Sequence, residues 1–201
     1  VSAAAGAAPR GRPGRSPTMR VALYEHVSAG GLTADAAGTA AAAEAEALRR
    51  LELDLMPAGR AMRDALGADL LALAGGAERG DGATRWQVTL VGAPAEAAAD
   101  DAHGPEANAR RGAADQGLLR RWARRPGEPT RAALARLAAE HDRVWAIAPE
   151  TGGLLAACRE AVGDGRWLGC GADAIAVAAS KRRTTALLQA AGVATPHQVG
   201  A

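Results

Sequence analysis

Short apolar segments alternate with alanine-rich or amphipathic segments along most of this chain, and glycine-rich turns separate them. The apolar runs predict strands at 20–24, 86–92, 143–150 and 166–169. The intervening patterns predict helices at 33–54, 57–73, 130–142, 151–162, 172–179 and 181–191. Because parallel strands need long crossover connections, this alternation favours a parallel sheet with flanking helices. The sequence therefore predicts an α/β domain.

Two regions interrupt the pattern. Residues 1–18 hold three arginines and no acid among Ala, Gly, Pro and Ser, so we expect a disordered tail, with Val1 or Met19 as the true start. Residues 93–129 contain four prolines and predict a long irregular connection, in which a short helix near 115–124 is an option. The expected domain spans 19–197. Residues 198–201 lie beyond this expected domain.

Composition and spacing argue against several classes of protein. No apolar run approaches the roughly 20 residues that span a bilayer, so we expect a soluble, cytoplasmic protein without a membrane partner. Cys158 and Cys170 form no CxxC pair and are expected to be buried, reduced side chains. No histidines show the spacing of a zinc site, and we assign no metal ligand. The four arginines around Trp122 are expected on a solvated helix face, which gives no nucleic-acid partner.

Candidate site residues follow three predicted strands, in the loops 25–31, 149–153 and 169–173, where ligands bind in parallel sheets. Glu25 and Ser28, beside Gly30 and Gly31, suit a carboxylate or zwitterionic ligand that the glycine backbone can approach closely. Two further candidates, Glu150 and Thr151, stand at a helix N-terminus, which favours anions. A plain structural turn is the alternative for each loop. The segment "GCGADA" (169–174) imitates a dinucleotide fingerprint, but no acid follows Asp173 to hold a ribose.

Lys181 is the only lysine in the chain, because 23 of its 24 basic residues are arginine. A lone lysine in such a chain indicates a position that requires a compact ammonium rather than a planar guanidinium. Chance survival of one lysine is the alternative.

Several segments together resemble a known family. "YEHVSAGGL", "AGRAMRDALGADL", "VWAIAPETGGLL" and "LGCGADAIAVAASKRRTTALLQAAGVATP" stand in the order seen in the N-terminal part of ATP-grasp carboxylate–amine ligases. The chain looks most like the branch that includes tyramine–glutamate ligase, over roughly residues 19–197 but not across 93–129. The resemblance implies a Rossmann-like pre-ATP-grasp domain. It further implies that Glu25, Ser28, Gly30, Gly31, Glu150 and Thr151 bind an amino-acid-like substrate.

The same resemblance gives Lys181 a role as a contact of ATP phosphate, in the family segment "dK..t...L...Gv.tP", where Ser180 here replaces the usual acid. Members of the family use ATP and Mg²⁺ to convert a carboxylate into an acyl phosphate, which an amine attacks. Their adenine-binding, flap and metal-binding parts lie beyond the position of Ala201, so the resemblance implies that residues 198–201 are the truncated start of an ATP-binding domain that the chain lacks. We therefore expect an N-terminal fragment that binds ATP weakly, is inactive alone and contains no catalytic residue, with a homodimer as an option. The alternative is a non-catalytic Rossmann-like scaffold, acting alone or docked to a separate chain.

Overall fold

The computed structural model of the chain describes residues 18–37, 40–76, 85–94 and 118–196. The predictions for 1–17 and 198–201, and for most of the connection between 93 and 129, lie outside these described residues. Thr18, which the sequence assigned to the tail, is instead the first residue of the first strand.

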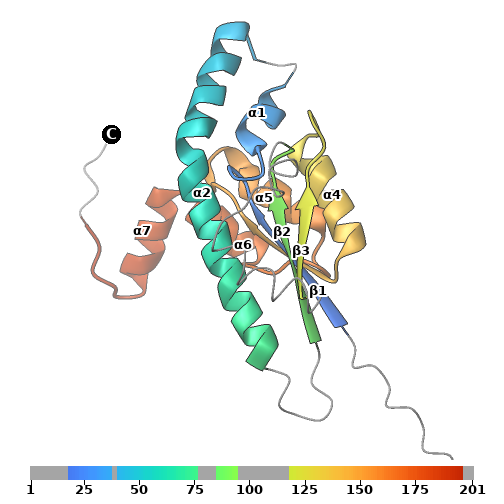
Figure 1. Cartoon of the computed structure of the whole chain (residues 1–201). Coiled ribbons are helices and arrows are strands. Elements are labelled where there is room, and N and C mark those ends of the chain that lie inside the picture. Colours follow the sequence, from blue (N-terminus) through green and yellow to red (C-terminus); the bar gives the residue numbers. More distant parts are fainter. Residues whose placement is uncertain (1–17, 38–39, 77–84, 95–117, 197–201) are drawn as a thin grey trace, which may run out of the picture.

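The fold is α/β, built on one parallel sheet (Figure 1). Its strands are β1 (Thr18–Glu25), β2 (Arg85–Gly92), β3 (Leu119–Ala123) and β4 (Arg143–Ile147), in the order β3-β2-β1-β4. All three pairs of neighbouring strands are parallel, as the sequence predicted. The strand expected at 166–169 is reduced to a single bridge between Val144 and Trp167.

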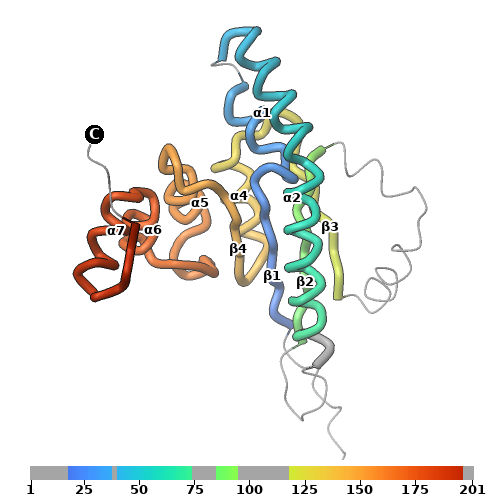
Figure 2. Tube along the Cα trace, turned by 90° about the vertical axis from the view of Figure 1, so that its left-hand side faces the viewer, coloured from blue at the N-terminus to red at the C-terminus, as the bar shows by residue number. Residues whose placement is uncertain are grey.

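Helices cover both faces of the sheet. They are α1 (Gly31–Ala36), α2 (Ala42–Gly76), α4 (Thr130–Glu140), α5 (Leu154–Val162), α6 (Ala172–Ala178) and α7 (Lys181–Ala190). Viewed toward α2, the strands follow one another from β3 to β4, with α2 in front of the sheet and α4 behind it (Figure 2). Beyond the β4 edge come α5 and then α6 and α7 (Figure 2).

Alternate residues of β1 feed two hydrophobic clusters, because successive side chains of a strand point to opposite faces. Ala22 and Tyr24 pack with the buried side chains of α4 and α5. Val21 and Leu23 pack on the other face, beneath Leu70 of α2. The central strand is therefore buried on both sides, and its carboxyl end is a rigid base for the loop that follows it.

Residues 42–76 form one continuous helix rather than two, and Pro57 lies inside it rather than at a helix start. The spacing of Met62, Leu66, Leu70 and Leu73 predicted the apolar face of this helix, and half of it is confirmed: Leu70 is buried and Leu66 packs on the same cluster, whereas Met62 and Leu73 are exposed. Glu52, Gly59 and Arg63 are buried as well. The close approach of α2 to the sheet explains why a glycine is buried on this side of the helix. A Cβ at position 59 would lie 2.4 Å from Glu25 Oε2, so the absence of a side chain lets α2 rest on the β1 loop.

The optional helix near 115–124 is wrong, because residues 119–123 form β3 and pair with β2 from Val88–Leu119 to Gly92–Ala123. Arg124 is buried, so the arginine-rich stretch is not a solvated helix face. The burial expected for Cys170 is wrong as well, whereas Cys158 is buried. Helices α6 and α7 confirm the segments 172–179 and 181–191, and Gly192, at φ 75°, follows α7 as predicted.

Candidate functional site

The loop that follows β1 is held by its own side chains. The Glu25 carboxylate is buried and accepts hydrogen bonds from the backbone N–H groups of Val27 (3.1 Å) and Ser28 (2.7 Å). Ser28 Oγ donates in turn to the Glu25 carbonyl oxygen at 3.3 Å. Both predicted ligand-binding side chains therefore also fix the shape of the turn.

The two glycines of this loop have different surroundings. Gly30 has φ 72°, a left-handed conformation that favours glycine, and it is the N-cap of α1. Gly31 packs against the ring of His26, where a Cβ would lie 2.2 Å from Cε1. Gly31 is thus required for packing beneath the loop, whereas Gly30 is required for the left-handed turn that leads into α1.

A polar cluster lies beneath the loop. Tyr24 Oη lies 3.2 Å from His26 Nδ1 and 3.3 Å from Thr130 Oγ1. Burial raises the pKa of Tyr24 and lowers the pKa of His26, so the phenol and the imidazole are both neutral at physiological pH. The strand and helix α4 are therefore joined here by neutral hydrogen-bonding groups.

Arg124 connects this cluster to two further segments. Its Nη1 donates to Tyr24 Oη at 3.5 Å, and its Nε (2.7 Å) and Nη2 donate to the Glu128 carbonyl oxygen. Its Nη2 also lies 3.6 Å from Asp35 Oδ1, which accepts the backbone N–H of Thr130 at 2.7 Å. One buried guanidinium thus holds β1, the end of α1 and the β3–α4 loop in a fixed arrangement.

Glu52 of α2 accepts hydrogen bonds from the first turn of α1. Its Oε1 accepts the backbone N–H groups of Leu32 (2.8 Å) and Thr33 (3.2 Å), and its Oε2 accepts the Thr33 hydroxyl at 2.5 Å. A carboxylate is favourable here because the first N–H groups of a helix have no partner within the helix. A negative charge is thereby fixed at the edge of the loop region.

A cavity of about 390 Å³ opens between these groups, at the carboxyl ends of β1, β2 and β3. Its lining residues come from four segments: Gly30, Thr33, Ala34, Ala37, Glu52, Met56, Ala93, Pro94, Arg124, Arg125 and Gly127. Two arginines and one carboxylate supply charge, and the remaining wall is mainly apolar. Such a cavity can hold a small molecule that carries charges of both signs on a short apolar body.

The structure brings some of the predicted site residues together and leaves others apart. Gly30 lines the cavity, and Glu25, Ser28 and Gly31 build the loop around it. In contrast, Glu150 and Thr151 are exposed after β4, and Lys181 is exposed at the start of α7. The roles of all seven residues remain predictions.

Sequence reasoning missed Tyr24, His26, Glu52 and Arg124. A signal was present for Arg124, since it directly follows the segment that forms β3, and a residue at the carboxyl end of a parallel strand is a candidate ligand contact. His26 carried the same signal, since it directly follows β1. Tyr24 and Glu52 gave no signal, because their proximity depends on how α2 and α4 pack on the sheet.

Other types of site find little support in the part of the chain that the structure describes. Residues 18–37, 40–76, 85–94 and 118–196 contain no group of three or more His, Cys, Asp or Glu side chains that could hold a metal ion. Within the same residues, no helix is both long enough and apolar enough to cross a membrane.

The β3–α4 region that carries Arg124 is also where the chain matches a family model. Residues 106–175 match the family model of the pre ATP-grasp 3 domain. The match supports an N-terminal domain of the kind associated with ATP-grasp enzymes. It runs through β3, α4, β4 and α5 to the start of α6, and so includes two cavity arginines. No curated protein and no solved structure matches the chain.

Proposed function

We propose that this chain is the N-terminal, substrate-binding part of an ATP-dependent ligase that joins a carboxylate to an amine. The observation that carries the proposal is the pre ATP-grasp match over residues 106–175, since the matched stretch supplies Arg124, Arg125 and Gly127 to the cavity. The tyramine–glutamate ligase branch, which the four quoted segments resemble, is our proposal for the place of the chain within that family.

The charges around the cavity favour an amino-acid-like substrate. Arg125 is exposed and can turn its guanidinium toward a carboxylate, and the buried Arg124 adds a second positive charge to the same wall. The hydrogen bonds described for Glu52 all come from neutral donors, so its negative charge is available to an ammonium group. Methylene groups of the substrate would lie against Met56, Ala93 and Pro94.

In this proposal the chain binds and orients the acid, and ATP supplies the phosphoryl group that activates it. Lys181 is our candidate contact for the ATP phosphates, because its side chain is exposed at the start of α7. No residue is assigned to Mg²⁺, since the described residues contain no suitable group of ligands, and we derive no step through the metal. The loop next to the cavity is kept in place by Glu25, Ser28, Gly30 and Gly31. We propose Glu150 and Thr151 as contacts of the substrate outside the cavity.

Calorimetric titration of the chain tests the substrate class. L-Glutamate carries both charges, whereas glutarate lacks the ammonium and putrescine lacks the carboxylates. We expect only L-glutamate to bind measurably among the three. Arg125→Gln should weaken binding by about tenfold, as expected for a lost charge-assisted hydrogen bond. Arg120→Gln is the matched control, because Arg120 is exposed on the same segment but does not line the cavity. Equal binding of glutarate and L-glutamate would contradict the proposed substrate class.

The ligase chemistry is tested with the full product of the gene in a coupled assay of ADP release. ADP should form only when ATP, an acid and an amine are all present, because the amine consumes the activated acid. Steady ADP release without any amine would indicate a simple ATPase, and no ADP release across a panel of acids and amines would argue for a binding module instead.

A further inference from the structure

One side of α2 is apolar although the described residues of the domain do not cover it. Leu51, Leu55, Ala58, Met62 and Ala65 follow one another at spacings of four and three residues, so they lie along one side of the helix. All five are exposed, and Met62 retains 49% of its accessible surface. We call this row the outer apolar face of α2. It lies beside the buried stripe of Glu52, Gly59 and Arg63, and among residues 18–37, 40–76, 85–94 and 118–196 nothing buries it.

An acid marks the end of this face. Asp69 follows Met62 by seven residues, which is close to two helical turns, and it therefore lies on the same side of α2. Of the other charged residues between Leu51 and Ala65, Arg60 and Asp64 fall on other sides of the helix, whereas Asp54 lies at the margin of this face, three residues after Leu51 and four before Ala58. The outer apolar face thus combines an apolar row with a carboxylate at its end.

Helix α7 has a matching surface and little contact with the domain. None of its residues is buried, and it packs on α6, where Thr184 Oγ1 donates to the Val177 carbonyl oxygen at 2.9 Å. Lys181 and Leu188 are also seven residues apart, and so lie on one side of α7. Leu188 retains 37% of its accessible surface. This side of α7 again combines an apolar residue with one charge, here an ammonium.

The two surfaces are complementary when the helices run antiparallel. Placing Lys181 against Asp69 then brings Leu188 against Met62, because seven residues separate the two positions on each helix. Thr185 falls between them, opposite the small side chain of Ala65. Opposite charges and apolar contacts coincide in this single register, whereas a parallel alignment would place Lys181 against Met62.

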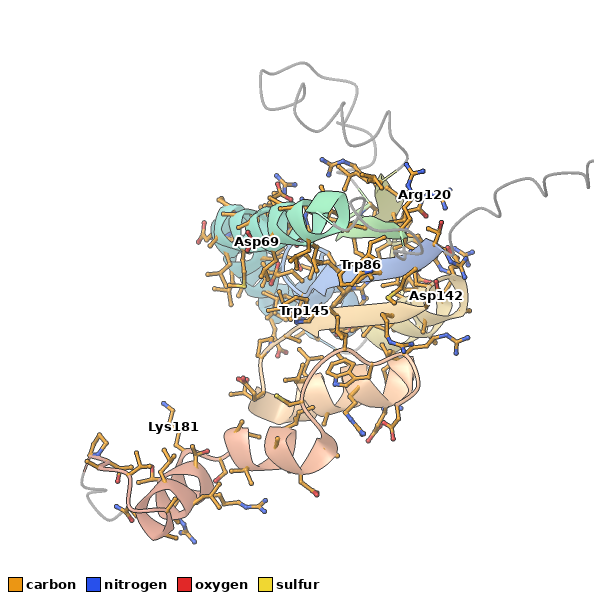
Figure 3. All side chains as sticks on the ribbon, turned by 90° about the horizontal axis from the view of Figure 1, so that it is seen from below. Asp69, Trp86, Arg120, Asp142, Trp145 and Lys181 are labelled. Atoms are coloured by element: carbon orange, nitrogen blue, oxygen red, sulfur yellow. The ribbon has the colours of Figure 1, made fainter. Side chains whose placement is uncertain are left out.

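We propose that α7 of one copy of this chain packs antiparallel on the outer apolar face of α2 in a second copy. Within one chain, α7 stands apart from α2, beyond the β4 edge (Figure 2). Asp69, Trp145 and Lys181 lie toward the same open side of the molecule, and the Lys181 side chain projects from α7 toward the side on which α2 lies (Figure 3). Reciprocal exchange of the two helices would close a symmetric dimer. The proposal does not depend on the proposed ligase function, and it gives Lys181 a partner in the nucleotide-free chain.

Sedimentation velocity of the full chain over a range of concentrations tests the apolar half of the contact. We expect a reversible dimer, and Met62→Glu should raise its dissociation constant by at least about tenfold, because a charge would be buried against Leu188. Leu53→Glu is the matched control. Leu53 is 64% exposed on the same helix but lies away from the outer apolar face, so the dissociation constant should be unchanged. Circular dichroism confirms that each variant is folded.

A charge exchange tests the register. Asp69→Lys and Lys181→Asp should each weaken the dimer about three- to tenfold, and the variant with both changes should recover the affinity of the original chain. A chain that stays monomeric at every concentration overturns the proposal. It is equally overturned by a dimer that Met62→Glu does not weaken, or by a double exchange that fails to restore affinity after both single changes reduced it.

Discussion

At the scale of single residues, Arg124 is the group on which the candidate site depends most. It is buried, and its guanidinium contacts Tyr24, Glu128 and Asp35 from three different segments. Arg124→Met keeps much of the volume but removes every donor, so the Glu128 carbonyl oxygen loses its side-chain donor and the Asp35 carboxylate loses its positive partner. We expect the free energy of unfolding in urea to fall by about 2–3 kcal/mol.

The neighbouring arginine provides the control for that change. Arg125 is exposed, and the same substitution, Arg125→Met, should alter the free energy of unfolding by no more than about 0.5 kcal/mol. If both variants are destabilised equally, the buried contacts of Arg124 do not hold the three segments together, and the effect belongs to the loop as a whole.

Histidine burial makes stability depend on pH. Burial lowers the pKa of His141, whose Nε2 accepts the Thr89 hydroxyl at 2.9 Å while Nδ1 donates to the Leu137 carbonyl oxygen at 2.8 Å. The pKa of His26 is lowered for the same reason. Below a pH of about 6.5 the unfolded chain therefore binds more protons than the folded chain does. Stability should be full above this pH and should decline as the pH falls through the lowered pKa values.

The measurement is the urea midpoint between pH 5.5 and 7.5. The carboxyl groups with lowered pKa values, Glu128 and Asp142, titrate below this window and do not contribute to the slope. His141→Gln should retain hydrogen bonding to Thr89 and flatten the pH dependence of the urea midpoint. The pH dependence that remains should come from His26. An unchanged slope in His141→Gln would show that the imidazole of His141 is protonated as easily in the folded chain as in the unfolded one.

At the scale of elements, the sequence predicted the apolar strands, and it missed β3, one of the two edge strands. "VALY" and "VWAI" are apolar because β1 and β4 pack against helices. In contrast, "LRRWA" at the edge exposes Arg120 and Arg121, so its pattern also fits a helix. The face of α2 was predicted only in part, because the helix buries Leu70 but also uses glycines and a carboxylate to approach the β1 loop.

Pro57 lies inside α2, and its replacement tests what a proline costs within this long helix. A proline inside a helix removes the hydrogen bond to the carbonyl four residues earlier, here that of Leu53, and its ring crowds the preceding turn. Because Pro57 is exposed, Pro57→Ala should stabilise the chain by about 1–2 kcal/mol in urea unfolding. A loss of stability would instead show that a bend at Pro57 is needed for Glu52 and Arg63 to reach the sheet together.

At the scale of the whole molecule, the candidate site could not be found from sequence because it is assembled from distant segments. Four elements contribute to it: β1 with Tyr24, α2 with Glu52, the end of β3 with Arg124, and α4 with Thr130. Local signals exist only for the loop after β1, in its glycines and its place at a strand end, and for Arg124, which directly follows β3. The position of the cavity then follows from strand order: β2 and β3 lie on one side of β1, and the cavity opens on that side. Between β1 and β4, the backbone N–H of His26 donates to the Ile147 carbonyl oxygen at 2.9 Å and joins the two strand ends.

The distribution of buried surface also predicts which part of the molecule opens most readily. Val21–Tyr24 of β1 are buried on both faces, whereas α7 buries no residue and packs on α6. Hydrogen exchange at low protein concentration should therefore show almost no protection for residues 181–190 and the highest protection for 21–24, because opening α7 uncovers little apolar surface. Raising the concentration should slow exchange in α7, and along 51–65 of α2, only if a second copy covers them. Strong protection of α7 in dilute solution would contradict this prediction, since α7 would then be held by its own chain.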